Sequence, residues 1–143
     1  MEIHPKKKNL LFIILLSFFM QACFPVYKTI RPFIEVQVVD ENGQSIRDAK
    51  VVRMTDQTPA RVSTVFDVGI SDHEGLVRFE QKRKWEFESF IIHGVQYYSW
   101  TLCVSKQGYK TIDQIKIDEN SNREVVLNLQ RTKSKTEPCS DES

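Results

Sequence analysis

A two-residue alternation of side chains along residues 33–130 constrains the fold of this chain more than any other feature. In its first stretch Ile34, Val36 and Val38 face one way, and the residues between them face the other way. This period gives an extended strand one apolar face, whereas an amphipathic helix needs apolar residues three and four positions apart. No run of ten or more residues beyond position 33 has that helical spacing. The pattern therefore predicts an all-β domain.

Two turn sequences of the same form separate the alternating stretches. Asp40-Glu41-Asn42-Gly43 and Asp72-His73-Glu74-Gly75 each begin with Asp and end with Gly, which accepts a positive φ. The other expected strands lie near residues 49–54, 76–79, 98–104, 112–117 and 125–129. Two such turns favour an antiparallel meander, and residues 33–130 span roughly the 100 residues of an immunoglobulin-sized sandwich. We expect an antiparallel β-sandwich of about seven strands, or a small barrel.

The first 22 residues have the composition of a secretory signal peptide. Lys6, Lys7 and Lys8 precede an apolar run at 10–20 that only Ser17 interrupts. As a helix this run rises about 16 Å, against a hydrocarbon core of about 30 Å. It is too short to span a bilayer alone, so we expect a signal-peptide helix ahead of the β domain.

The end of this segment, Met20-Gln21-Ala22-Cys23, resembles the lipobox of bacterial lipoproteins. That resemblance implies cleavage after residue 22 and acylation of Cys23, and hence a lipid bilayer as partner. Leu is commoner in the family than Met20, and a small residue is commoner than Gln21. Phe24 stands where an Asp signals inner-membrane retention, which implies a periplasm-facing protein at the outer membrane rather than the inner one. The alternatives are an uncleaved anchor and an ordinary signal peptide.

Charge and composition bound the rest of the chain. With 20 Lys and Arg against 19 Asp and Glu the formal charge is +1, and removing residues 1–22 changes it to −1. This balance argues against a nucleic-acid partner. Residues 23–32, with Pro25 and Pro32, are expected to form a lipidated tether. The polar residues 131–143 are expected to be a disordered tail.

Three segments together resemble the carboxypeptidase regulatory-like domain, a transthyretin-like β-sandwich. They are a strand, Gly turn and return strand at 36–51, Ser71-Asp72-His73-Glu74-Gly75-Leu76-Val77-Arg78-Phe79, and Val104-Ser105-Lys106-Gln107-Gly108-Tyr109-Lys110-Thr111. Ser45 stands where the family favours Pro, and residues 80–96 have the character of an inserted loop. The resemblance implies a structural or interaction module over residues 33–130.

No residue set in the sequence predicts catalysis, a metal or a cofactor. Ser71, Asp72 and His73 are adjacent in a turn, where consecutive side chains splay apart instead of converging as a triad must. Asp40 could open a calcium loop, but Val51 stands where an EF-hand needs Glu. His73 and His93 could join Cys103 or a carboxylate around zinc, but no paired ligand spacing supports this. We predict no catalytic residues, no metal site and no cofactor.

Two features have alternative interpretations. Trp85, Phe87 and Tyr97 belong to a dense aromatic region that either packs in the core or forms a binding surface, whereas Tyr98 and Trp100 alternate into the core. Arg78, Lys82, Arg83 and Lys84 form either a solvated basic loop or a contact for anionic lipid headgroups or lipopolysaccharide.

The two remaining cysteines of the mature chain, Cys103 and Cys139, could pair in an oxidising compartment and attach the tail to a strand. A free, reactive Cys103 is the other interpretation. Alternation places Cys103 on the face of its strand opposite Leu102 and Val104.

The sequence as a whole is typical of a membrane-anchored envelope lipoprotein whose β-sandwich binds an envelope protein or serves structure. The alternatives are an outer-membrane anchoring subunit of a secretion or envelope machine, a carbohydrate- or cell-wall-binding module and, behind these, an enzyme.

Overall fold

A computed structural model describes residues 24–58, 65–88, 96–118 and 124–139. Cys23 and the signal-peptide segment lie outside this range. The chain divides into two compact units, residues 1–28 with 84–96 and residues 29–83 with 97–143; we call them the ribbon unit and the sandwich unit. The described residues form strands and contain no helix. The strands are β1 (Phe24–Arg31), β2 (Ile34–Asp40), β3 (Lys50–Thr58), β4 (Val65–Ile70), β5 (Leu76–Phe79), β6 (Lys82–Glu88), β7 (Tyr97–Ser105), β8 (Ile112–Ile117) and β9 (Glu124–Leu129).

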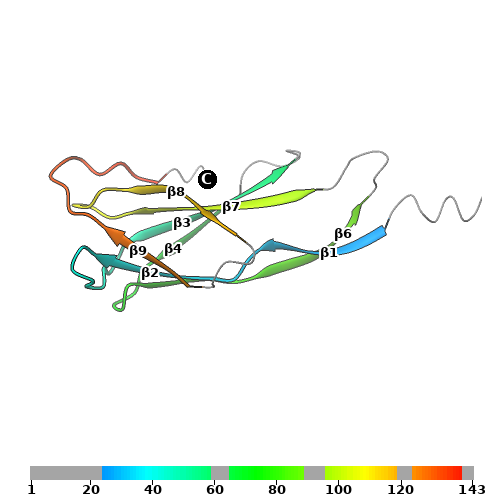
Figure 1. Ribbon diagram of the computed structural model, residues 1–143, viewed down its shortest axis with the longest axis horizontal. Helices are drawn as coiled ribbons and strands as arrows, with labels where there is room; N and C mark the ends of the chain where they lie inside the picture. Colours follow the sequence, from blue (N-terminus) through cyan, green and yellow to red (C-terminus); the bar gives the residue numbers. More distant parts are fainter. Residues whose placement is uncertain (1–23, 59–64, 89–95, 119–123, 140–143) are drawn as a thin grey trace, which may run out of the picture. The chain divides into compact units, whose positions relative to one another are not determined.

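The sandwich unit contains two sheets, one with the order β5-β2-β9 and one with the order β4-β3-β7-β8 (Figure 1). The all-β sandwich predicted from the alternation is confirmed. These two sheets account for the seven strands expected. Strands β1 and β6 form a separate two-stranded sheet.

Both sheets contribute alternate side chains to one core. Val36 on β2, Val51 on β3 and Leu102 on β7 are each 0% exposed. Burying a side chain of this size contributes about 1.5–3 kcal/mol. The whole core cluster consists of Ile34, Val36, Val38, Ile46, Ala49, Val51, Val77, Phe79, Leu102, Val104, Leu127 and Leu129.

The strand order differs from the expected meander. β2 pairs with β5 antiparallel and with β9 in parallel, while β3 pairs with β4 and β7. Consecutive strands therefore change sheet at both Asp-x-x-Gly turns, from β2 to β3 and from β4 to β5. A tight turn can direct the chain across a sandwich as well as back along the same sheet. The sequence signal is the same in the two cases.

The two turns themselves have the predicted geometry. The Asp40 carboxylate accepts hydrogen bonds from the backbone N–H groups of Asn42 (2.8 Å) and Gln44 (2.9 Å). In the second turn Asp72 accepts from Glu74 (2.8 Å) and Leu76 (2.9 Å). The closing glycines, Gly43 and Gly75, have φ values of 78° and 75°.

Two segments expected to be irregular contain strands. Residues 24–31, expected to belong to a tether, form β1, and the expected loop at 80–96 contains β6. β1 and β6 pair with each other. Because each strand depends on a partner that is distant in the chain, neither segment was recognisable as a strand from its own sequence. The pairing joins positions more than fifty residues apart in the chain.

Candidate functional site

The ribbon unit presents three large aromatic side chains to solvent. Tyr27 on β1 is 52% exposed, and Trp85 and Phe87 on β6 are 65% and 74% exposed. The ring centroids of Tyr27 and Trp85 lie 5.1 Å apart with an interplanar angle of 43°. Trp85 and Phe87 are two positions apart on one strand, and alternation places them on the same face. We call these three residues the aromatic face.

Charged residues alternate with the aromatic ones and are paired. The ammonium of Lys28 forms an ion pair with Glu88, which is 7% exposed, and donates to the carbonyl of Gln96 at 2.6 Å. Lys84 and Glu86 form a second pair at 2.8 Å. Because side chains alternate along a strand, these pairs are directed away from the face that carries Trp85 and Phe87.

Among the proposed surface residues, Tyr97 lies in the other unit. It is 66% exposed at the start of β7. Further along β7, Trp100 is 5% exposed, and its indole N–H donates to the carbonyl of Ile30 at 2.7 Å. Core packing therefore describes Trp100, whereas Trp85, Phe87 and Tyr97 are exposed. Sequence reasoning missed Tyr27, because only strand pairing brings it to Trp85.

Three residues of the expected basic loop, Arg78, Arg83 and Lys84, have hydrogen-bond or ion-pair partners on the strands. Arg78 on β5 donates to Glu35 at 2.5 Å, and Arg83 donates to the Thr29 hydroxyl at 3.1 Å. Hydrogen bonding to Glu35 raises the pKa of Arg78. Arg78 and Arg83 thus link neighbouring strands of the sheets to which they belong.

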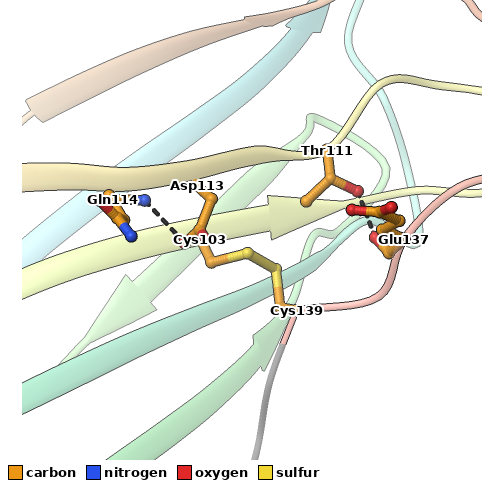
Figure 2. Close-up of a disulfide and its surroundings, with 6 residues drawn as sticks. All are labelled: Cys103, Thr111, Asp113, Gln114, Glu137 and Cys139. Atoms are coloured by element: carbon orange, nitrogen blue, oxygen red, sulfur yellow. Dashed lines mark hydrogen bonds between the residues drawn. A yellow bond between two sulfur atoms is a disulfide. The ribbon is translucent and has the colours of Figure 1, made fainter.

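Cys103 and Cys139 form a disulfide, the pairing that the sequence left open (Figure 2). Their Cα atoms are 5.8 Å apart, and both residues are 3% exposed. They pack with Val52, and with Met54 and Phe66, in a cluster separate from the main core. Cys103 therefore lies on the face of β7 opposite Leu102 and Val104.

The C-terminal segment 131–139 is held against the sandwich, in contrast to the disordered tail expected there. The Thr132 N–H donates to the Gly108 carbonyl (2.9 Å), and the Thr136 hydroxyl donates to the Tyr109 carbonyl (3.0 Å). The Thr111 hydroxyl donates to the carbonyl of Glu137, beside the disulfide (Figure 2). The polar sequence of this segment did not predict that it would be ordered. Hydrogen bonds to backbone groups and one disulfide hold the segment in place, instead of the burial of apolar side chains. Residues 140–143 lie outside the described range.

Ser71, Asp72 and His73, the residue types of a catalytic triad, each contact other groups in the structure. The Ser71 hydroxyl donates to the Ile46 carbonyl and accepts from the Ala49 N–H, both at 2.8 Å. The Asp72 carboxylate is bound within its turn. The His73 side chain is 80% exposed, and its nearest charged partner is Glu74 at 3.7 Å. The three groups do not converge.

The described residues carry neither a metal-binding cluster nor a membrane-spanning helix. They contain no cluster of three or more His, Cys, Asp and Glu residues able to hold a metal ion. They likewise contain no helix long and apolar enough to span a membrane. His93 and the acylation candidate Cys23 lie outside those residues.

Comparison with known proteins adds no relative. No family model, no curated protein and no solved structure matches this chain.

Proposed function

We propose that this chain is a lipid-anchored protein of the bacterial cell envelope, in which a non-catalytic β-sandwich serves as a module for binding another envelope protein. In this proposal the sandwich belongs to the carboxypeptidase regulatory-like, transthyretin-like class. Acylated Cys23 attaches it to the outer membrane, facing the periplasm. The aromatic face is the surface offered to the partner.

The observation that carries the proposal is the aromatic face, together with its place in the chain. Aromatic residues are enriched at the centres of protein interfaces, because a rigid ring buries a large area at low entropic cost. Tyr27 lies four residues after Cys23, so an acylated Cys23 would hold β1 close to the membrane surface. The ion pairs of the ribbon unit are directed away from the aromatic face, so they do not place charge on it.

The anchor is tested by labelling cells with a palmitate analogue. Label is expected on the wild-type chain and not on the Cys23→Ser variant, because the thiol is the acylation site. An uncleaved anchor would instead leave the Cys23→Ser variant membrane-bound and label absent from both chains. Persistent label on the variant would place the lipid elsewhere and contradict the assignment.

The binding surface is tested by in-cell crosslinking and mass spectrometry. Phe87→Ser is expected to reduce the yield of envelope proteins crosslinked to the chain. The matched control is Val126→Ser, which changes a side chain 58% exposed on β9 in the sandwich unit. Equal yields from Phe87→Ser and the wild-type chain would exclude the aromatic face as the partner surface. If the crosslinked partners all belong to one assembly, the result indicates that the chain is an anchoring subunit of an envelope machine.

A carbohydrate- or cell-wall-binding module is a second candidate, because exposed aromatic rings also stack on sugars. The chain has two tryptophans, Trp85 exposed and Trp100 buried. A glycan on the aromatic face would therefore quench the fluorescence of Trp85 saturably, and Trp85→Phe would abolish the change. Unchanged emission with cell-wall oligosaccharides would exclude this candidate.

A further inference from the structure

We propose that the hollow between the C-terminal segment and the end of the sandwich binds a phosphate group carried on a sugar or a lipid headgroup. The hollow has a volume of about 640 Å³. Its lining includes four lysines, two from the sandwich and two from the C-terminal segment: Lys50, Lys106, Lys133 and Lys135. All lie in the sandwich unit. The proposal does not depend on the lipid anchor.

The concentration of positive charge is local. The whole chain carries a formal charge of only +1, whereas the lining of the hollow contains four lysines and one carboxylate, that of Asp48. That carboxylate forms an ion pair with Arg47 at 3.2 Å. The ammonium of Lys106 donates to the backbone carbonyl of Asp48 at 3.1 Å, which orients this cation at the hollow.

The C-terminal segment adds two lysines to the hollow. Lys133 and Lys135 line the same hollow as Lys50 and Lys106, so placing the segment there brings like charges together. The disulfide at Cys139 and the hydrogen bonds of Thr136 hold it in place. Departures from local consistency of this kind mark functional sites, where other interactions offset the cost. A bound anion would relieve the repulsion.

The donor chemistry selects the ligand class. Lysine ammoniums bind phosphate as point charges, and the volume exceeds that of a bare phosphate ion while lying within the 300–1,000 Å³ usual for small-molecule sites. The hydroxyl-bearing residues Ser105 and Ser134 also line the hollow and can donate to sugar or phosphate oxygens. Exposed cations imply an affinity that falls with salt.

The test is calorimetric titration of the disulfide-intact Cys23→Ser chain, which carries no lipid on residue 23, with glucose 1-phosphate, and vesicle sedimentation of the same chain with phosphatidylglycerol against phosphatidylcholine. We expect Lys133→Gln/Lys135→Gln to weaken binding about tenfold. The control Lys82→Gln/Lys116→Gln removes the same charge from exposed lysines outside the hollow and should change affinity less than about twofold. Glucose 1-phosphate binding alone indicates a phosphosugar, and selective sedimentation with phosphatidylglycerol indicates a lipid headgroup.

A second variant tests the role of the disulfide. Cys103→Ser/Cys139→Ser, with its fold verified by circular dichroism, should lose affinity as much as Lys133→Gln/Lys135→Gln because the C-terminal lysines are released. No saturable binding to either probe would overturn the proposal. An equal loss in the Lys82→Gln/Lys116→Gln control would also overturn it, because the effect would then follow net charge and not the hollow.

Discussion

Arg53 is a charged side chain on the inner face of β3, with only 2% of its surface exposed. Its Nε and Nη2 groups donate to Asp67 on β4 at 3.1 and 2.8 Å, and its Nη1 donates to the Pro32 carbonyl at 2.7 Å. The guanidinium carbon lies 4.9 Å from the centre of the Phe79 ring. Burial lowers the pKa of Arg53, and the hydrogen bond to Asp67 opposes this shift.

Removing the partner of Arg53 should be costly. Asp67 also pairs with Arg31 at 2.6 Å. We expect Asp67→Ala to lower the free energy of unfolding by about 3 kcal/mol, because it leaves the buried Arg53 and the partly buried Arg31 without their shared counter-charge. Arg53→Met/Asp67→Val should recover the part of that loss that comes from Arg53, since the apolar pair needs no desolvation, while Arg31 stays without its partner. Urea unfolding measures both. The control is Glu124→Ala, which changes an exposed acidic residue on β9. If Asp67→Ala and Glu124→Ala lowered the free energy of unfolding by similar amounts, the loss would not come from the buried ion pair.

Gly75 combines a positive φ with a close backbone contact. A Cβ atom there would lie 2.5 Å from the Val38 carbonyl oxygen, whereas one at Gly43 would meet nothing within 4 Å. Both substitutions to Ala incur the left-handed backbone cost of about 1–2 kcal/mol. Gly75→Ala should therefore lower the melting temperature clearly more than Gly43→Ala. Equal shifts would show that the backbone relaxes around position 75.

At the scale of the element, the two Asp-x-x-Gly turns make stability depend on pH. The backbone N–H of Gln44 chiefly lowers the pKa of Asp40, and that of Leu76 chiefly lowers the pKa of Asp72. The folded chain therefore binds fewer protons than the unfolded chain near the ordinary carboxyl pKa. This stabilisation is complete above about pH 4 and is lost as the pH falls through the lowered pKa values.

Asp72→Asn isolates this contribution. The variant should unfold at a lower temperature than the wild-type chain at pH 7, and the difference should narrow from about pH 4 downward. Thermal unfolding from pH 7 to pH 2 measures it. Glu41→Gln removes an exposed charge within the other turn and should give no comparable pH-dependent difference. A constant difference for Asp72→Asn at all pH values would exclude the carboxylate as its cause.

At the scale of the whole molecule, the disulfide closes a long stretch of chain. Cys103 and Cys139 are 36 residues apart. Loop-closure entropy predicts that Cys103→Ala/Cys139→Ala lowers the free energy of unfolding by about 3–4 kcal/mol. Urea unfolding with and without reductant is the measurement. Reductant should destabilise the wild-type chain and leave Cys103→Ala/Cys139→Ala unchanged. A wild-type chain that is no less stable with reductant than without it would contradict a stabilising disulfide.

Alternation and turn chemistry are local properties, and the sequence by itself determined them. Side chains two positions apart share a face of any strand, so Val36, Val38, Leu102 and Val104 were recognisable as core. Asp and Gly shape a turn through their own backbone contacts, so both turns were predictable. The position of Cys103 on the face of β7 opposite Leu102 and Val104 followed from the same alternation.

What only the tertiary structure decided depends on which distant segments meet. Parallel pairing of β2 with β9, the β1–β6 sheet and the Arg53–Asp67 pair all join residues that no local spacing relates. The docking of residues 131–139 is of the same kind, since a polar segment gains its position from partners elsewhere in the chain. The aromatic face and the lysine-lined hollow arise in this way, because each is assembled across strands or segments whose contact is selected by the packing of the whole chain.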